Sequence, residues 1–366
     1  MTIKKFGAPI ALLAATALSL SGCAANETPA APAASSSSGA AALTGTLAGQ
    51  GSSAMGAAQK TWAAEFQTRN PGVTINYNPA GSGAGRDAFV AGAAQYAGSD
   101  RAFKDDEMGA GKFGKCAADS SALNLPTFVS PIAVMFNIQG IKELKLQPEV
   151  VAGIFTGKIT KWNDPAITAT NPGVTLPDAT ITAVHRADDS GTTENFTDYL
   201  NKAAPAVWTE KADGEWPSAF AGEAAQGTSG VVGAVKNGQN TIGYADLGQV
   251  GDLGKVSVGV GSEFMAPTAE AAAKMVEASP KVANRTQHDW ALSLDRKAAG
   301  AYPIALVAYT MVCEDYKDDA EAKLVKAYVG YTLSADGQKA AQDKAGAAAL
   351  SAAMQANVKA AIDSVK

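Results

Sequence analysis

Residues 181–200, ITAVHRADDSGTTENFTDYL, hold the pattern that decides the fold. Residues 181–185 are predicted to form a β-strand. The apolar residues of 196–200 recur at i, i+3 and i+4, which predicts the buried face of an α-helix. Between them, residues 186–192 run through Asp, Ser, Gly and Thr, which are typical of helix starts. The stretch therefore predicts a strand that passes directly into a helix, as in α/β folds.

The same strand-to-helix pattern occurs twice nearer the N-terminus. Residues 45–48 lead into a turn of Gly and Ser at 49–53, after which apolar residues over 55–66 mark a helix face. Residues 73–77 alternate as in a strand and run into the glycine-rich turn 81–85, where another helix is expected. Three times, Gly, Ser or Thr stands where a helix should begin.

This recurrence predicts a binding site for an oxyanion. A helix start exposes unpaired N–H groups and the positive end of the helix dipole. Glycine lets a ligand approach the backbone, and Ser or Thr hydroxyls add donors. Each turn alone is equally well explained as an ordinary helix cap. Three turns in one chain, one of them beginning with the forked, permanently charged Arg186, favour the binding site.

Composition bounds the remaining possibilities. The chain has 366 residues, of which 46% are hydrophobic and 18% charged, and this length suggests two domains. A net charge of -5 without a basic patch argues against a nucleic-acid partner. Two His and three Cys leave little material for a metal site, so we expect neither a metal nor another cofactor.

The N-terminus predicts export. Two lysines precede an apolar stretch over 10–20, which is short for a bilayer span but suits a secretory signal. The stretch ends at Leu-Ser-Gly-Cys23, which resembles a bacterial lipobox. We therefore expect a signal peptide over 1–22, a lipidated Cys23 and a flexible Ala/Ser/Pro tether over 23–42. The protein would be anchored to the outer face of the cytoplasmic membrane. The alternative is an ordinary signal peptide with a chance cysteine.

Two further cysteines lie in the predicted folded part. In an oxidising compartment Cys116 and Cys313 would tend to pair. The alternative, two buried free thiols, stays open from the sequence.

The sequence lacks the common motifs of nucleotide-binding proteins and serine hydrolases. The chain contains no G-x-x-x-x-G-K-[ST] loop, and the spacing of the glycines over 81–85 differs from G-x-G-x-x-G. The serines of the three turns, Ser53, Ser82 and Ser190, lack the glycines on both sides that a nucleophile elbow requires. The two histidines are expected to be structural, capping or surface residues. We therefore expect a binding protein and not an enzyme.

Over nearly its whole length from Leu43, the chain resembles the phosphate-binding lipoprotein of the bacterial phosphate-specific (Pst) ABC transporter, a periplasmic solute-binding protein. The most specific motif is Arg186-x-Asp188-x-Ser190-Gly191-Thr192. Supporting motifs are Gly49-x-Gly51-Ser52-Ser53, Gly81-Ser82-Gly83, Gly98-Ser99-Asp100, Ile154-Phe155-Thr156-Gly157-Lys158, Lys161-Trp162-Asn163-Asp164, Ile242-Gly243-Tyr244 and Tyr302-Pro303-Ile304.

The resemblance implies a set of phosphate ligands: Ser53, Ala54, Ser82, Asp100, Arg186, Ser190, Gly191 and Thr192. Ser53 and Ser82 would give hydroxyls, and Ala54 would give its backbone N–H. Arg186 would bind phosphate oxygens, held in place by Asp188. Asp100 would be the one acceptor of the set.

The Asp100 role also has a chemical argument. Phosphate keeps a proton near neutral pH and sulfate does not, so a buried carboxylate accepts a bond from phosphate and repels sulfate. From local sequence alone, Asp100 is better explained as a turn residue at the end of a strand, and the resemblance reverses that preference.

Two positions depart from common family patterns: Ser53 replaces a frequent Thr, and the second turn reads Gly-Ser-Gly-Ala. Asp189 adds a carboxylate nearby, which we expect to face solvent.

The implied architecture is a two-lobed α/β fold of the periplasmic-binding-protein type (type II, Venus-flytrap) with a hinged ligand cleft. Residues 43–127 and 302–366 would form lobe I, and residues 128–301 lobe II. The implied partners are inorganic phosphate and the permease subunits of an ABC importer, and we expect a monomer. The alternatives are a receptor of the same fold for sulfate or molybdate and, from a different class, a surface phosphatase or an adhesive protein.

Overall fold

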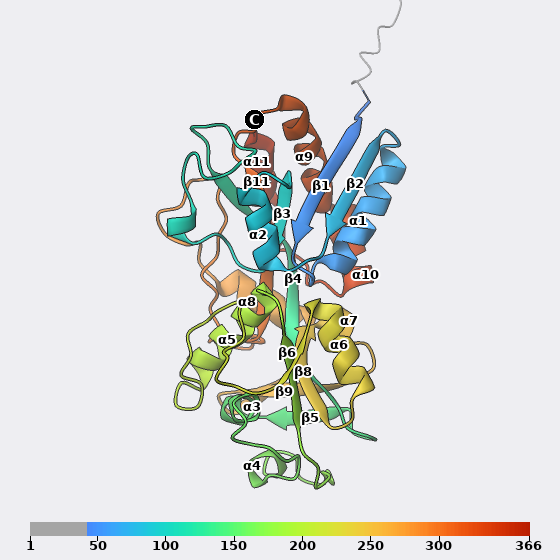
Figure 1. Cartoon of the computed structure of the whole chain (residues 1–366), viewed down its shortest axis with the longest axis vertical. Helices are drawn as coiled ribbons and strands as arrows, with labels where there is room; N and C mark the ends of the chain where they lie inside the picture. Colours follow the sequence, from blue (N-terminus) through green and yellow to red (C-terminus); the bar gives the residue numbers. More distant parts are fainter. Residues whose placement is uncertain (1–41) are drawn as a thin grey trace, which may run out of the picture. The chain divides into compact units, whose positions relative to one another are not determined.

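The computed structural model describes residues 42–366 (Figure 1). The predicted signal peptide over 1–22, the lipidation at Cys23 and the tether up to 41 lie outside the described residues. Within 42–366, no helix combines the length and the apolar character that a membrane crossing requires.

Strands and helices alternate through most of the described chain, which confirms the predicted α/β class. The strands are β1 (Gly45–Gly51), β2 (Val73–Asn78), β3 (Tyr96–Ser99), β4 (Ala122–Asn137), β5 (Glu143–Leu146), β6 (Thr182–Arg186), β7 (Glu223–Ala225), β8 (Thr241–Asp246), β9 (Gly254–Val260), β10 (Glu263–Met265) and β11 (Ala305–Cys313). The helices are α1 (Gly56–Arg69), α2 (Ser82–Val90), α3 (Pro148–Phe155), α4 (Pro165–Thr168), α5 (Gly191–Ala203), α6 (Gly227–Asn237), α7 (Leu247–Val250), α8 (Ala269–Ala278), α9 (Asp319–Thr332), α10 (Ala335–Ala345) and α11 (Ala352–Ser364), with a 3₁₀ turn at Asp105–Glu107.

The long strand β4 connects two groups of strands. Strands run in the order β2-β1-β3-β11-β4-β8-β6-β7, and β9 pairs with β4, β5 and β10. Residues 122–131 of β4 pair with β11, and residues 132–137 pair with β8. Figure 1 shows β4 passing from the β1, β2 and β3 group to the β6, β8 and β9 group. Nearly every residue of β4 is buried, as its apolar sequence requires. β4 also crosses the predicted lobe boundary between 127 and 128, and the lobe boundaries stay a prediction.

All three predicted strand-to-helix turns are confirmed: β1 leads to α1, β2 to α2, and β6 to α5. The apolar stripe of the α5 stretch is buried, with Phe196 and Leu200 fully enclosed. The ring of Phe196 lies 4.4 Å from that of Tyr244 on β8 and 4.9 Å from that of Phe155 on α3, centroid to centroid. Burying such a side chain contributes about 2–3 kcal/mol. This packing holds the start of α5 in a fixed position.

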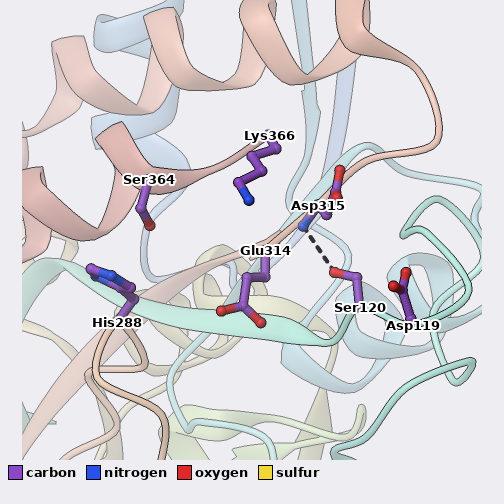
Figure 2. A pocket seen from close by; sticks show the side chains of 7 residues that line it. All are labelled: Asp119, Ser120, His288, Glu314, Asp315, Ser364 and Lys366. Carbon is purple, nitrogen blue, oxygen red and sulfur yellow. Dashed lines mark hydrogen bonds between the residues drawn. The ribbon is translucent and has the colours of Figure 1, made fainter.

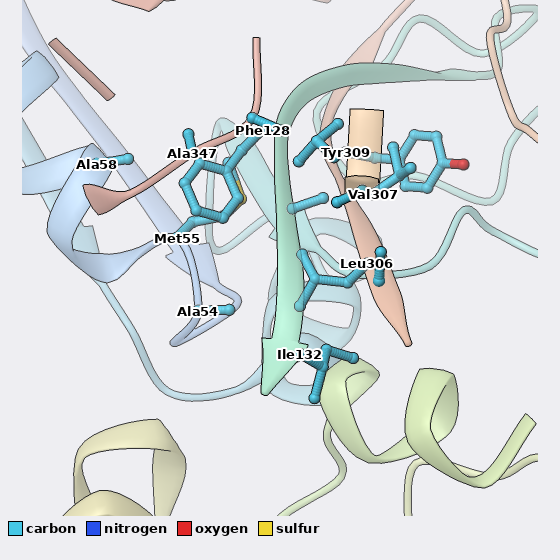
Figure 3. Close-up of a cluster of buried hydrophobic side chains, with 14 of the residues drawn as sticks. Ala54, Met55, Ala58, Phe128, Ile132, Leu306, Val307, Tyr309 and Ala347 are labelled. Carbon is cyan, nitrogen blue, oxygen red and sulfur yellow. The ribbon is translucent and has the colours of Figure 1, made fainter. Parts of the chain in front are cut away.

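The helix that follows β1 is anchored in the same way. Trp62 and Phe66 of α1 are buried, as the sequence pattern predicts. Just before this helix, Ala54 and Met55 belong to the apolar cluster around Phe128 of β4 (Figure 3). The backbone of the first turn is therefore held by side chains that point into the core.

The structure joins Cys116 to Cys313 in a disulfide, with the two sulfur atoms 2.03 Å apart. Cys313 ends β11, and Cys116 lies in the loop before β4. The bond links segments separated by 197 positions in the sequence. It therefore ties the last strand to the connection between β3 and β4.

Candidate functional site

The three predicted turns meet at Asp100, directly after β3. The side-chain oxygens of Asp100 accept hydrogen bonds from Ser52, in the β1–α1 turn, and from Thr192 Oγ1 at the start of α5, the latter at 3.0 Å. The backbone N–H of Asp100 donates to Ser82 Oγ, in the β2–α2 turn, at 3.1 Å. β1, β2 and β3 run parallel, so their carboxyl ends share one edge of the sheet, where α/β proteins commonly bind ligands. Asp100 is 3% exposed.

The start of α5 provides free backbone donors next to Asp100. Ser190 is the N-cap, and its hydroxyl accepts the N–H of Thr193 at 3.2 Å. Gly191 and Thr192 occupy the first helical positions, where N–H groups have no partner within the helix. These are the groups that bind anions at helix starts.

Gly191 is required by a close approach. A Cβ atom at this position would lie 2.7 Å from both Ser82 Oγ and Asp100 Cβ. Any larger residue would push α5 away from the two turns that it contacts. The glycine of the family motif therefore closes the distance between α5 and the turns after β2 and β3.

Arg186, at the end of β6, forms a forked ion pair with Asp188. Its Nε donates to Asp188 Oδ1 at 2.7 Å, and its Nη2 bonds Asp188 Oδ2. The backbone N–H of Gly227 also donates to Asp188 Oδ1, at 3.0 Å. Burial acts to raise the pKa of Asp188, but the hydrogen bonds and charge of Arg186 outweigh it and hold the pKa below its ordinary value. The buried Arg186 is thus fixed along one edge, and its Nη1 has no hydrogen-bond partner among the described residues.

Asp100 has the opposite electrostatic balance. Burial raises its pKa, and the hydrogen bonds from Ser52 and Thr192 lower it only in part, as do the charges of Arg186 and Arg86. The net direction is upward. Asp100 is therefore a carboxylate that gains from a further hydrogen-bond donor when it is ionised.

Asp189 does not simply face solvent as expected. Its carboxylate is 40% exposed, and Oδ2 forms an ion pair of 2.9 Å with Nη2 of Arg86 on α2. Nη1 of Arg86 donates to Ser99 Oγ at 3.1 Å. The negative charge of Asp189 is thus offset next to the site. Arg86 was not predicted from the sequence as part of the site; it lies four residues after Ser82, one turn further along α2.

A fourth turn of the same kind, which was not predicted from the sequence, lies between β7 and α6. Thr228 donates its backbone N–H to Ser53 Oγ at 3.1 Å, and the two hydroxyl oxygens lie 2.9 Å apart. The signal was present in Gly-Thr-Ser-Gly at 227–230. The preceding strand, β7, has only three residues, too few for a periodicity to be visible.

Asp246, at the end of β8, is a second buried carboxyl group near the site, and it was not predicted from the sequence. Its Oδ1 accepts from Gln249 Nε2 at 2.9 Å, and the same nitrogen donates to the carbonyl oxygen of Ser53 at 3.1 Å. Burial, followed by the charge of Asp100, raises the pKa of Asp246 well above its ordinary value. A raised pKa favours the protonated form of this carboxyl group, which adds no charge against an anion.

The two histidines lie outside this cluster of turns. His185 stacks on Trp216 with ring centroids 4.8 Å apart, and its Nδ1 contacts the carbonyl oxygen of Arg186 at 2.9 Å. His288 lines a separate cavity of about 330 Å³, shown in Figure 2. That cavity is bordered by three carboxylates, Asp119, Glu314 and Asp315, against the single ammonium of Lys366, so it disfavours an anion. Among residues 42–366 no group of three or more His, Cys, Asp or Glu is arranged to hold a metal ion.

The chain is similar in sequence to known proteins. The sequence profile described as "PBP superfamily domain" matches residues 36–336. The chain is 33% identical over 347 residues to phosphate-binding protein PstS3 of Mycobacterium bovis BCG, covering 92% of each protein. It is 31% identical over 377 residues to phosphate-binding protein PstS 2 of Mycobacterium tuberculosis, covering 100% of both.

A solved structure shows the same fold. It is a putative phosphate ABC transporter substrate-binding protein with bound phosphate from Clostridium perfringens, which aligns with a TM-score of 0.60 at 20% identity. The alignment covers 84% of this chain and 100% of that one. The α/β periplasmic-binding-protein fold expected from the sequence is thereby confirmed.

Proposed function

Because this chain belongs to the PstS family of phosphate-binding proteins, within the PBP superfamily, we propose that it binds inorganic phosphate outside the cytoplasm and delivers it to an ABC importer. The observation that carries the proposal is the arrangement around Asp100. A single buried acceptor lies beside hydroxyls, free helix N–H groups and a fixed arginine. A protonated oxyanion needs this combination, because it has several acceptor oxygens and one O–H donor.

In the proposed complex, each turn supplies part of the ligand shell. The backbone N–H groups of Gly191 and Thr192 and the free nitrogen of Arg186 bind phosphate oxygens from the β6–α5 side. Ser53 and Ala54 bind them from the β1–α1 turn. Ser82 and Ser190 complete the shell with their hydroxyls. The charge of the anion is offset by one guanidinium and by the positive ends of the helices.

Asp100 supplies the selectivity in this proposal. In the structure, the hydroxyl of Thr192 donates to Asp100 Oδ2. On binding, the P–O–H group takes that place, and the Thr192 hydroxyl turns to donate to a phosphate oxygen. Sulfate has no proton to give near neutral pH, so it leaves the buried carboxylate facing lone pairs and negative charge. We expect this mismatch to cost sulfate several powers of ten in affinity.

The bonds at the site also suggest how binding is coupled to closure. Asp100 and Ser53 belong to predicted lobe I, and their partners Thr192 and Thr228 belong to predicted lobe II. A ligand that contacts both sides favours the closed arrangement over the open one. In this proposal, release to the permease subunits requires these bonds to break.

The remaining parts of the proposal follow from transport. A receptor of this kind binds and releases phosphate without changing it, so we propose no catalytic activity. Export and a lipid anchor on Cys23 would keep it at the outer face of the cytoplasmic membrane, close to the permease.

Isothermal titration of phosphate-stripped protein with phosphate and with sulfate at neutral pH tests the function. We expect saturable binding of one phosphate per chain and no measurable heat from sulfate at the same concentration. Tighter binding of sulfate or molybdate than of phosphate would identify a receptor for another oxyanion. Binding of neither anion would contradict the proposal.

A further inference from the structure

The turn between β7 and α6 contacts both halves of the proposed phosphate shell. The backbone N–H of Gly227 donates to Asp188 Oδ1 at 3.0 Å, and Asp188 holds Arg186. The next N–H along the chain, that of Thr228, donates to Ser53 Oγ at 3.1 Å. This one turn therefore contacts both Asp188, which holds Arg186, and Ser53, which lies just before α1.

Gly227 is suited to this double contact by its backbone. Its φ angle is +66°, a conformation that glycine adopts at little cost and most other residues avoid. The turn directs two successive N–H groups to different partners. The conformation of the turn is therefore held by Gly227 and by the hydrogen bonds of the two N–H groups to Asp188 and Ser53.

The hydroxyl of Thr228 determines what Ser53 can do. A serine hydroxyl has one proton to donate and two lone pairs to accept with. Thr228 N–H occupies one lone pair of Ser53 Oγ, and the Thr228 hydroxyl lies 2.9 Å away, where either oxygen can be the donor. If Thr228 donates, both lone pairs of Ser53 are filled, and the only remaining function of that hydroxyl is to donate its proton elsewhere.

We propose that Thr228 is a positioning residue for phosphate binding: it fills both acceptor positions of Ser53 and so directs the Ser53 proton to the anion. This inference rests on the proposed function and adds to it a residue outside the three turns recognised in the sequence. Thr228 is 1% exposed, so water does not compete for its hydroxyl. Because Ser53 and Thr228 belong to different predicted lobes, their bonds also hold the closed state.

The test is the affinity and dissociation rate of phosphate in Thr228→Val, which keeps the shape of the side chain and removes the hydroxyl. We expect the Kd to rise about tenfold, as for one lost buried hydrogen bond, with most of the change in the dissociation rate. Thr228→Ser restores the hydroxyl and should return Kd to within about twofold of the wild type. Ser229→Ala is the matched control, since Ser229 is the exposed neighbour on the same turn.

A double-mutant cycle separates positioning from a general structural role. If Thr228 acts through Ser53, Thr228→Val should not weaken phosphate binding further in a Ser53→Ala background. Equal weakening in both backgrounds, or a wild-type Kd in Thr228→Val, would overturn the inference. If Thr228→Val does not fold, as judged by circular dichroism, Thr228→Ala is read by the same criteria. A wild-type protein that binds no phosphate would instead remove the proposed function, and this inference with it.

Discussion

Asp100 and Arg186 are both buried, but only Arg186 forms an ion pair. Arg186 is compensated by Asp188 in a forked pair, whereas Asp100 accepts only from neutral groups. The site therefore has one fixed cation and one carboxylate that can accept a hydrogen bond from the O–H group of a ligand. Burial raises the pKa of Asp100, whereas at Asp188 the hydrogen bonds and charge of Arg186 outweigh burial and lower the pKa.

The raised pKa of Asp100 predicts a pH dependence of selectivity. Above that pKa the carboxylate accepts from phosphate and repels sulfate. As the pH falls through it, Asp100 becomes protonated, loses its acceptor role and ceases to repel sulfate. The ratio of the Kd for sulfate to the Kd for phosphate should therefore decrease toward acid pH, as measured by competition calorimetry. A ratio that is constant or increases on acidification would contradict this assignment.

The raised pKa of Asp100 also predicts how the stability of the ligand-free protein depends on pH. A carboxyl group whose folded pKa is raised favours the folded state at low pH, and that contribution is lost as the pH rises through the folded pKa. Asp246 acts in the same direction. The stability that these two carboxyl groups contribute to the ligand-free protein should therefore decrease as the pH rises through their folded pKa values. Differential scanning calorimetry of the ligand-free protein across pH measures the decrease in Tm, and a Tm that increases over this range would contradict the assignment.

Arg186 should carry a large part of the affinity. Arg186→Ala removes the only guanidinium proposed to contact phosphate, and charge-assisted bonds of this kind contribute about 1.5–3 kcal/mol each. We expect the Kd for phosphate to rise about 100-fold or more, by calorimetry. The exposed Arg69, which pairs with Asp336 on the surface, provides the control Arg69→Ala. Equal affinities of Arg186→Ala and the wild type would exclude Arg186 from the site.

At the scale of elements, the site is built by helix starts that packing brings together. The turns after β1, β2 and β6 were predictable, because each follows a recognisable strand and precedes an apolar helix stripe. The turn after β7 was not, since a three-residue strand leaves no period to detect. Ser52 was not singled out, because only the structure shows that its hydroxyl reaches Asp100.

Long-range ion pairs were also beyond the sequence. Arg86 and Asp189 are separated by 103 positions, and their contact depends on how α2 packs beside the β6–α5 turn. Arg86 offsets the negative charge of Asp189 beside the proposed anion site. From the sequence, Asp189 was expected only to face solvent. Figure 1 shows α2 in the upper group of elements and α5, which directly follows β6, in the lower group.

This pair leads to a prediction about α2. Arg86→Gln leaves Asp189 without its cation, so its negative charge acts on the bound anion. We expect phosphate affinity to fall by about three- to tenfold, and more at low ionic strength, where charges are less screened. Adding Asp189→Asn should restore affinity, because the uncompensated charge is then gone. A double variant as weak as Arg86→Gln alone would show that Arg86 acts in another way.

On the scale of the whole molecule, long-range links hold the described chain together. β4 pairs with β11 along one half and with β8 along the other, and the disulfide fastens the end of β11 to the loop before β4. The alternation of strands and helices allowed the α/β class to be predicted, and the family resemblance added the periplasmic-binding-protein type. The 16-residue strand β4 was not predicted, because it carries two prolines, Pro126 and Pro131, which normally argue against a central strand.

The disulfide should contribute to stability and not to recognition. In the chain-entropy model, a loop as long as the one between Cys116 and Cys313 contributes about 5 kcal/mol, although measured gains are often smaller. Cys116→Ala/Cys313→Ala should therefore lower Tm by several degrees and leave the Kd for phosphate unchanged. Thermal unfolding and calorimetry of the same preparation measure both. An unchanged Tm would show that the bond adds no stability, and an altered Kd would show that it affects the site.

The central claim is that Asp100 recognises phosphate by accepting a hydrogen bond from its P–O–H group. The most direct measurement is competition calorimetry of phosphate against sulfate on Asp100→Asn, with the exposed Asp119→Asn as control. The amide can donate to an anion that has no proton, so the preference for phosphate over sulfate should fall by at least tenfold, while Asp119→Asn keeps the wild-type ratio. An Asp100→Asn protein that folds and retains the wild-type preference would contradict the account.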